Sequence, residues 1–133
     1  EDKMASVKAD RRYTKDHEWA KVDGSVVQVG ISQYAVDQLG DITLVNLDVT
    51  EGDKIAKGAA FGTIESVKTL SDLFSPVTGT IKKLNRDLDD KPELVNSDCY
   101  AAWMVTIEVS GTSEVDELMT SEAYETLLGT LDH

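Results

Sequence analysis

The sequence predicts a mainly β domain, a small sandwich or barrel, with helices at its C-terminal end. Short runs rich in valine, isoleucine and threonine recur along the chain, and turn-forming residues separate them. After Gly111 the pattern becomes helical, with acidic residues in the first turns. The length of 133 residues suits one compact domain and is short of two ordinary ones. These observations together favour a single small β domain followed by helices.

The N-terminal part begins without a recognisable element. Residues 1–12 carry mixed charges and no periodicity, which predicts a flexible N-terminus followed by a single domain over 13–133. The first predicted strand covers 25–31. Ser32 can then cap a two-turn helix with apolar residues on one side, and Gly40 is expected to end that helix.

The remaining strands are predicted from the same composition. We expect them at 41–47, 60–66, 71–74, 80–84 and 102–109, with turns at 51–53 and around Gly79. The polar segment 85–98 is too long for a plain hairpin, so it is expected to be a loop. In the C-terminal part, Ser113 and Ser121 are candidate N-caps, and Gly129 is expected to end the second helix.

The charge balance excludes two classes of partner. The chain has 25 acidic and 13 basic residues, a net charge of −12. Binding to a phosphate backbone is driven by clustered basic residues, so no nucleic-acid partner is expected. An anionic membrane surface would repel such a chain, and no apolar stretch approaches the roughly 20 residues of a membrane helix. The single cysteine, Cys99, excludes an intrachain disulfide.

Residues for several common chemistries are missing. The chain has no glycine-rich phosphate loop, and no second histidine follows His17-Glu18 at the spacing of a zinc-binding helix. One cysteine and two histidines cannot build a closed zinc site, so no metal site is predicted. A nucleophile built from Cys99 and His17 remains an alternative, although an incidental buried cysteine is the favoured interpretation. No catalytic residue is therefore predicted.

The informative segment surrounds Lys68. It lies between two strand-like runs, near the tip of a predicted hairpin, with Glu65 and Asp72 on either side. Tight hairpins usually carry glycine, asparagine or aspartate at the turn, but this one has β-branched Val67 and Thr69 beside the lysine. The usual residue preferences of tight turns therefore do not explain the residues found at this turn. The competing interpretation is a solvent-facing lysine with local ion pairs, each worth less than about 1 kcal/mol.

The motif around this lysine is similar to one in a known family. Glu65-Ser-Val-Lys68, followed by Ser71-Asp72 and Ser75-Pro-x-x-Gly79, resembles the lipoylation hairpin of the glycine cleavage system H-protein family. Further matches in the family's order and spacing are His17-Glu-Trp19, Val29-Gly-Ile31, Leu39-Gly-Asp41, Asn85, Pro92-Glu-Leu-Val-Asn96, Trp103, Glu117-Leu-Met and Glu122-Ala-Tyr124. The resemblance runs from about residue 13 to residue 128.

The resemblance implies a fold and a cofactor. The fold is a barrel-sandwich hybrid, two antiparallel sheets packed face to face with short C-terminal helices. The cofactor is lipoic acid, attached covalently to Lys68 as N6-lipoyl-lysine, and Glu65 and Asp72 belong to the modification hairpin. Glu18 is expected in the cleft that receives the arm, beside its amine end, while His17 and Trp19 are expected to be packing residues. The protein would be a covalent-cofactor carrier with a swinging arm and not an enzyme.

The resemblance also implies partners in one-carbon metabolism and glycine catabolism. Glycine decarboxylase, a pyridoxal-phosphate enzyme, would transfer the aminomethyl group of glycine to the arm. A tetrahydrofolate-dependent aminomethyltransferase would take the methylene unit, and dihydrolipoyl dehydrogenase would reoxidise the arm. A lipoate-attaching enzyme would modify the lysine. The carrier is expected to be a monomer, cytoplasmic in a bacterium, which is the favoured source, or in the mitochondrial matrix of a eukaryote.

Two alternative functions stay open, and the sequence departs from the family pattern at three places. An H-like lipoyl relay protein, which carries lipoate for transfer elsewhere, would use the same lysine. A catalytic domain built on Cys99, His17 or Glu18 is the other alternative. A histidine seen in some family members is replaced by Gln38, and two small residues after the lysine are replaced by Thr69-Leu70. The Gly-Trp common before the last strand is Ala102-Trp103.

Overall fold

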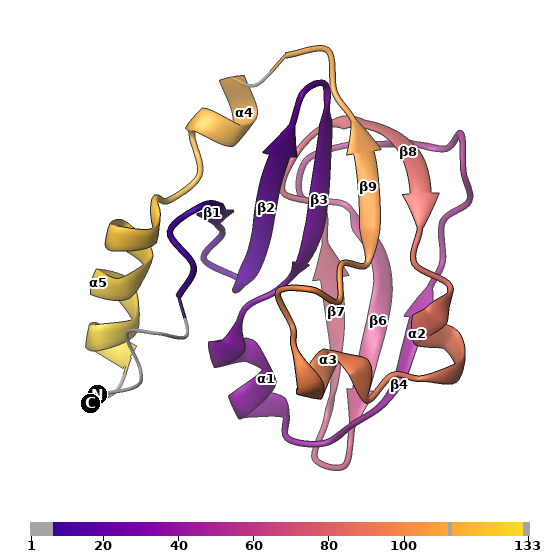
Figure 1. Cartoon of the computed structure of the whole chain (residues 1–133), viewed down its shortest axis with the longest axis vertical. Coiled ribbons are helices and arrows are strands. Elements are labelled where there is room, and N and C mark those ends of the chain that lie inside the picture. Colours follow the sequence, from indigo (N-terminus) through magenta and orange to yellow (C-terminus); the bar gives the residue numbers. More distant parts are fainter. Residues whose placement is uncertain (1–6, 112, 132–133) are drawn as a thin grey trace.

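The structure is a computed structural model that describes residues 7–111 and 113–131, and it contains two antiparallel sheets. The larger sheet has the strand order β1-β2-β3-β9-β8-β5, and the smaller sheet has the order β4-β6-β7. The smaller sheet lies behind the larger one in Figure 1, and the helices are grouped at one end and along one edge. The predicted architecture of two face-to-face sheets with short C-terminal helices is confirmed.

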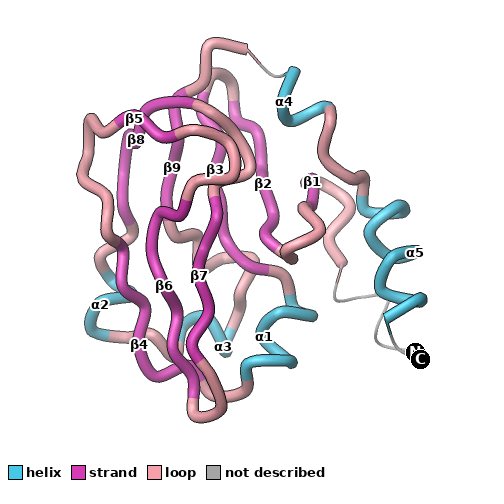
Figure 2. Tube along the Cα trace, turned by 180° about the vertical axis from the view of Figure 1, so that it is seen from behind, coloured by secondary structure: helices cyan, strands magenta, loops and turns pink. Residues whose placement is uncertain are grey.

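The elements have the following bounds. The strands are β1 Arg12–Tyr13, β2 Glu18–Asp23, β3 Val26–Ile31, β4 Ile42–Leu47, β5 Lys54–Ile55, β6 Ala60–Ser66, β7 Leu70–Phe74, β8 Gly79–Leu84 and β9 Val105–Glu108. The helices are α1 Gln33–Leu39, α2 Asp87–Asp90, α3 Leu94–Ser97, α4 Ser113–Asp116 and α5 Ser121–Leu131. Figure 2 shows the β6–β7 hairpin as a long projection beside α1. No helix of the described residues has the length and apolar content needed to cross a membrane.

The core has two parts. The main cluster fills the space between the sheets with buried aliphatic side chains and Phe61. A smaller aromatic cluster joins Tyr13 and Trp19 of the larger sheet to Tyr124 of α5, where the two tyrosine rings stack with centroids 4.4 Å apart. Gly30 is required opposite Trp19, because a Cβ at Gly30 would lie 2.6 Å from the indole ring.

The helix after β3 forms as the sequence predicts. The Ser32 hydroxyl accepts the Ala35 N–H at 3.3 Å, which supplies a partner for one free donor of the first turn. At the other end, Gly40 has φ +82° and its N–H donates to the Val36 carbonyl. The apolar side, Val36 and Leu39, is buried against the main cluster. Both predicted boundaries of this helix are therefore confirmed.

Two predictions about the second half were wrong. The predicted loop at 85–98 contains α2 and α3, each held by one fully buried side chain, Leu88 and Val95. These helices have only four residues each, too few for a helical period to appear in the sequence. The strand predicted at 102–109 is confined to β9, and before it the Trp103 carbonyl accepts the Asn85 side-chain amide in place of a strand partner.

The chain ends also differ from expectation. Helix α5 continues through Gly129 to Leu131, and its N-cap is Thr120, whose hydroxyl accepts the Ala123 N–H at 3.2 Å. A single glycine costs a helix only about 1 kcal/mol relative to alanine, so it need not end one. At the other end, residues 1–6 lie outside the described residues. The described part of the predicted flexible terminus is packed, since Val7 and Arg11 are buried and Arg12 pairs with Ala20.

Candidate functional site

The β6–β7 hairpin carries Lys68 in its turn, as predicted. Glu65 pairs with Leu70, so the turn consists of residues 66–69. The Ser66 hydroxyl accepts the N–H groups of Lys68 at 3.1 Å and Thr69 at 3.2 Å, while the Ser66 N–H donates to the Thr69 carbonyl at 2.8 Å. No residue of this turn has a positive φ, so no glycine is needed. A serine whose hydroxyl accepts backbone N–H groups can form such a turn, and this signal at Ser66 was not recognised in the sequence.

The tip of the hairpin is exposed but ordered by hydrogen bonds. Lys68 is exposed, and it makes no ion pair with any described residue. Its neighbours Val67 and Leu70 are 68% and 59% exposed, unusually high for large apolar side chains. The interpretation of Lys68 as a surface lysine held by local ion pairs is thus contradicted. The turn presents an accessible amine on a fixed support.

Glu65 and Asp72 occupy the same exposed face of the smaller sheet. Glu65 is in register with Leu44 on one side and Leu70 on the other, and Asp72 is in register with Thr63. Because side chains two residues apart in a strand share a face, the register places Glu65 and Asp72 on the same face of the hairpin. Asp72, on the edge strand β7, also lines the cleft described next, whereas Glu65 does not. Both side chains are available to a molecule that approaches Lys68 from that side.

A cleft of about 200 Å³ lies on the inner side of the hairpin, between β7 and α1. Its walls include the apolar side chains of Ile31, Leu39, Ile64 and Leu73. Thr69, next to Lys68, lines the cleft, and so does Glu18. Gln38 and Thr69, two of the positions that depart from the family pattern, therefore shape the cleft directly.

Glu18 is buried at the base of the hairpin, with 2% of its surface exposed. One carboxylate oxygen accepts the Thr14 hydroxyl at 2.9 Å, and the other accepts the Phe74 N–H at 3.1 Å. Burial raises the pKa of Glu18 from 4.5 to about 7, and these two hydrogen bonds oppose the shift. The carboxylate thereby joins β2 of the larger sheet to β7 of the smaller one. That bridging role was not predicted from the sequence.

His17 and Trp19, on either side of Glu18, have different environments. Trp19 is fully buried and its indole N–H donates to the Cys99 carbonyl at 3.1 Å, which confirms it as a packing residue. His17 packs against Tyr34 and Tyr124, but it also lines the cleft. Its backbone has φ +73°, uncommon for a residue other than glycine, and burial lowers its pKa.

Cys99 is not arranged as a nucleophile. Its side chain is buried, and burial raises the pKa of the thiol to about 12, which removes the reactive thiolate at neutral pH. Its sulfur lies 3.7 Å from the Gln33 side-chain oxygen, and no contact with His17 is present among the described residues. The alternative of a Cys99–His17 catalytic pair is contradicted.

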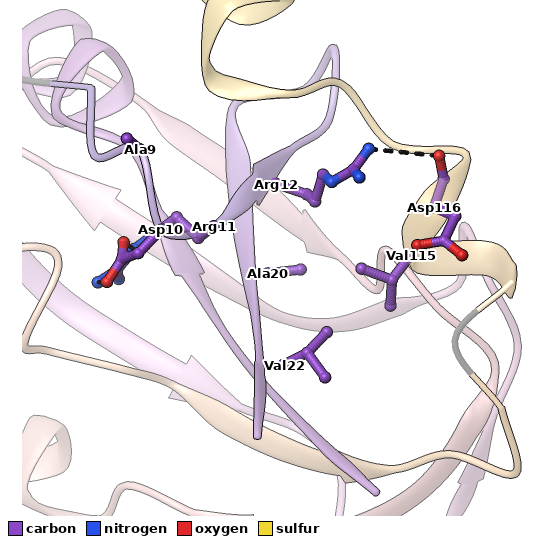
Figure 3. A pocket seen from close by; sticks show the side chains of 8 residues that line it. All are labelled: Ala9, Asp10, Arg11, Arg12, Ala20, Val22, Val115 and Asp116. Atoms are coloured by element: carbon purple, nitrogen blue, oxygen red, sulfur yellow. Dashed lines mark hydrogen bonds and ion pairs between the residues drawn. The ribbon is translucent and has the colours of Figure 1, made fainter. Parts of the chain in front are cut away.

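A separate hollow lies between β1, β2 and α4 (Figure 3). The Arg12 guanidinium donates to the backbone carbonyls of Asp116 at 3.4 Å and Leu118 at 3.1 Å, so it ties the edge strand to the C-terminal segment. Ala20, Val22 and other neighbours complete its walls, and no residue of the β6–β7 hairpin is among them. The hairpin and its inner cleft are therefore the candidate site.

Comparisons with known proteins agree on one family. A family model described as glycine cleavage H-protein matches residues 11–130. A glycine cleavage system H protein of Bacillus pumilus (strain SAFR-032) is 49% identical over 121 residues, which cover 90% of this chain and 94% of that protein. The crystal structure of a glycine cleavage system H protein from Mycobacterium marinum superposes with a TM-score of 0.83 at 35% identity, covering 92% of this chain and 99% of that one.

Proposed function

Because the chain belongs to the glycine cleavage H-protein family, we propose that Lys68 is the residue through which it carries a lipoyl group. Proteins of this family are carriers of the glycine cleavage system, and this chain is one of them. The observation that supports Lys68 is its place in the turn of an ordered hairpin, exposed and without an ion-pair partner among the described residues. The amine is thus free to form an amide.

The residues around Lys68 fit a lipoyl group. The inner cleft begins beside Thr69, and its apolar walls of Leu39, Ile64 and Leu73 suit a hydrocarbon chain. When bound, a lipoyl group supplies a disulfide on a long flexible arm, which can be opened by a nucleophile and closed by oxidation. The chain's own contribution is presentation at the hairpin tip and shelter in the cleft.

Glu18 is proposed to hold a positively charged group that enters the cleft. Phe74, which donates to Glu18, is five residues along the chain from Thr69, a distance of about 17 Å in an extended strand. A carboxylate can accept about four hydrogen bonds, and Glu18 uses two. An ammonium group would use the remaining capacity and favour the ionised carboxyl, whose pKa burial has raised.

The partners follow from the family and from the charge. The chain works with the other components of the glycine cleavage system. In detail we propose glycine decarboxylase, the folate-dependent aminomethyltransferase, dihydrolipoyl dehydrogenase and a lipoate-attaching enzyme, acting in the cytoplasm because the relatives are bacterial. A net charge of −12 would guide the carrier toward basic surfaces around their active sites.

Labelling by a lipoate ligase tests the attachment site. The variant Lys68→Arg keeps the positive charge but cannot form the amide, so intact-mass measurement should show no lipoyl group. The matched control is Lys83→Arg, an exposed lysine on β8, which should be labelled as fully as the wild type. Labelling that persists in Lys68→Arg would overturn the assignment.

A further inference from the structure

Asn96, the last residue of the Pro92-Glu-Leu-Val-Asn96 stretch, connects α3 to the segment between α1 and β4. Its side-chain oxygen accepts the Ile42 N–H at 2.8 Å, and its side-chain nitrogen donates to the Gly40 carbonyl at 3.0 Å. A side-chain amide offers one acceptor and two donors, so it can satisfy a backbone segment as a neighbouring strand would. One half-buried side chain thus fixes the backbone on both sides of Asp41.

The 40–42 segment is hydrogen-bonded directly to the turn that carries Lys68. The Asp41 carbonyl accepts the N–H of Val67, the residue before the lysine, at 3.1 Å. Ile42 is also the β4 partner of Ser66, whose hydroxyl holds the N–H groups of the turn. The amide of Asn96 is therefore one residue removed from a backbone contact with the hairpin tip.

The lysine stem itself lies against the same segment. A Cβ built on Gly40 would be 3.0 Å from the Cε of Lys68 and 3.9 Å from its Nζ. Gly40 thus leaves space that the lysine stem occupies, and its φ of +82° is one that other residues rarely adopt. Movement of Gly40 would change both the surface under Lys68 and the support of Val67.

We propose that Asn96 is a positioning residue for Lys68. Its two hydrogen bonds hold 40–42 in one conformation, and this segment sets the direction in which Lys68 leaves the hairpin. The inference rests on the proposed function, in which Lys68 is the residue that is lipoylated. Helix α3 is itself anchored in the core, since the neighbouring Val95 is fully buried, so it can hold Asn96 in place.

The test compares Asn96→Ala with Asn85→Ala. Asn85 is also half-buried, and its side chain donates to a backbone carbonyl, that of Trp103, at 2.7 Å, but among the described residues it forms no hydrogen bond with 40–42 or with the hairpin. Amide hydrogen exchange of unmodified protein, followed by NMR, should be about tenfold or more faster at Val67 in Asn96→Ala and unchanged there in Asn85→Ala. Lipoylation by a lipoate ligase should show a lower kcat with little change in KM in Asn96→Ala alone.

The outcomes separate this proposal from the proposed function. If wild-type protein is not lipoylated at Lys68, the proposed function fails, whatever the exchange data show. If wild type is lipoylated but Asn96→Ala matches it in Val67 exchange and in kcat, the positioning role is overturned and the function stands. Equal losses in the Asn96 and Asn85 variants would also overturn it, because general destabilisation would explain them.

A second variant covers failure of Asn96→Ala to fold. Asn96→Asp keeps the acceptor for Ile42 but replaces the donor to Gly40 with a carboxylate oxygen that faces the Gly40 carbonyl, so exchange at Val67 should be faster and kcat lower than in wild type. Wild-type values for Asn96→Asp, in both measurements, would count against a role for the Gly40 contact and against the proposal.

Discussion

The tip and the base of the β6–β7 hairpin differ in their exposure to solvent. The tip exposes Lys68, whereas the base contacts the buried Glu18 of β2. At the tip, Lys68 is exposed, and its turn is ordered by the Ser66 hydroxyl and by the Asp41 carbonyl. At the base, Glu18 is 2% exposed and hydrogen-bonds the Phe74 N–H. In the proposed function, attachment of an arm at Lys68 requires access from solvent, whereas retention of a charged group at Glu18 requires removal from solvent, and the hairpin separates these two requirements along its length.

The largest expected effect is a pH dependence that arises at the base. The pKa of Glu18 is raised to about 7 by burial, so the folded protein binds a proton more tightly than the unfolded chain does. Its contribution to stability is then full below about pH 4.5 and is lost as pH rises through about 7. At about 1.4 kcal/mol per pKa unit, the loss is about 3 kcal/mol at most. Urea unfolding between pH 4.5 and 8 should show it in wild type and not in Glu18→Gln.

Glu65→Gln is the control for that pH series. It removes a carboxylate from the exposed outer face near the tip, where the side chain is open to water. If Glu65→Gln removes the same pH dependence as Glu18→Gln, the difference between base and tip is contradicted.

The second effect concerns retention of a loaded arm. Glu18→Gln should leave the fold and the lipoylation of Lys68 intact, because an amide can still accept from Phe74 and meet Thr14. A neutral amide attracts an ammonium group less than a carboxylate does, by about 1.5–3 kcal/mol. The arm should therefore leave the cleft about ten- to a hundredfold more often. Release of formaldehyde and ammonia from loaded carrier should quicken accordingly, and an unchanged lifetime would make Glu18 a purely structural bridge.

The third prediction is that added salt slows the encounter at the hairpin tip but leaves retention at its base unchanged. In the proposed function, exposed charges steer the encounter of the tip with glycine decarboxylase, and salt screens such charges within about 10 Å at 0.1 M. The rate of arm reduction should therefore fall several-fold as ionic strength rises through the physiological range. The lifetime of loaded carrier depends on the buried Glu18 and should change little. A reduction rate indifferent to salt would leave the acidic surface with a role in solubility only.

The smallest effect is expected at the turn. Ser66→Ala removes the acceptor for two exposed N–H groups, and water can replace it, so the stability loss should be only about 0.5–1 kcal/mol. Lipoylation of Lys68 should slow by a few-fold because the turn becomes less ordered. The control is Ser97→Ala, which loses an exposed hydroxyl contact in α3 and should be labelled at the wild-type rate. Equal slowing in the two variants would contradict the role of Ser66.

The sequence predicted those elements whose signal is local. The helix between Ser32 and Gly40 has a cap at each end, and the strand at 60–66 has its β-branched and aromatic residues in one run. Strand β2 was not predicted, because Glu18, Trp19 and Ala20 are all buried and no alternation of polar and apolar residues appears. One face of that strand packs on the main core and the other on the aromatic cluster.

The candidate site was predicted less completely. Lys68 could be placed at a hairpin tip because both flanking strands were recognisable. The contact of Glu18 with Phe74 and that of Asn96 with Gly40 join residues 56 positions apart, so neither leaves a local pattern. Such contacts depend on how the sheets and short helices pack, which propensity and periodicity do not encode.

The N-cap of α1 is joined to the His17 ring by a chain of hydroxyl hydrogen bonds. Ser32 Oγ accepts the Ala35 N–H, and Ser32 is fully buried, so its own proton needs an acceptor; Tyr124 Oη, at 2.6 Å, is the one available among the described residues. Tyr124 can then donate to His17 Nδ1 at 2.8 Å, which leaves the neutral imidazole protonated on Nε2. With Ser32 as the donor to Tyr124, a helix cap selects the tautomer of a histidine outside its own helix, and nitrogen chemical shifts of the His17 ring test that direction.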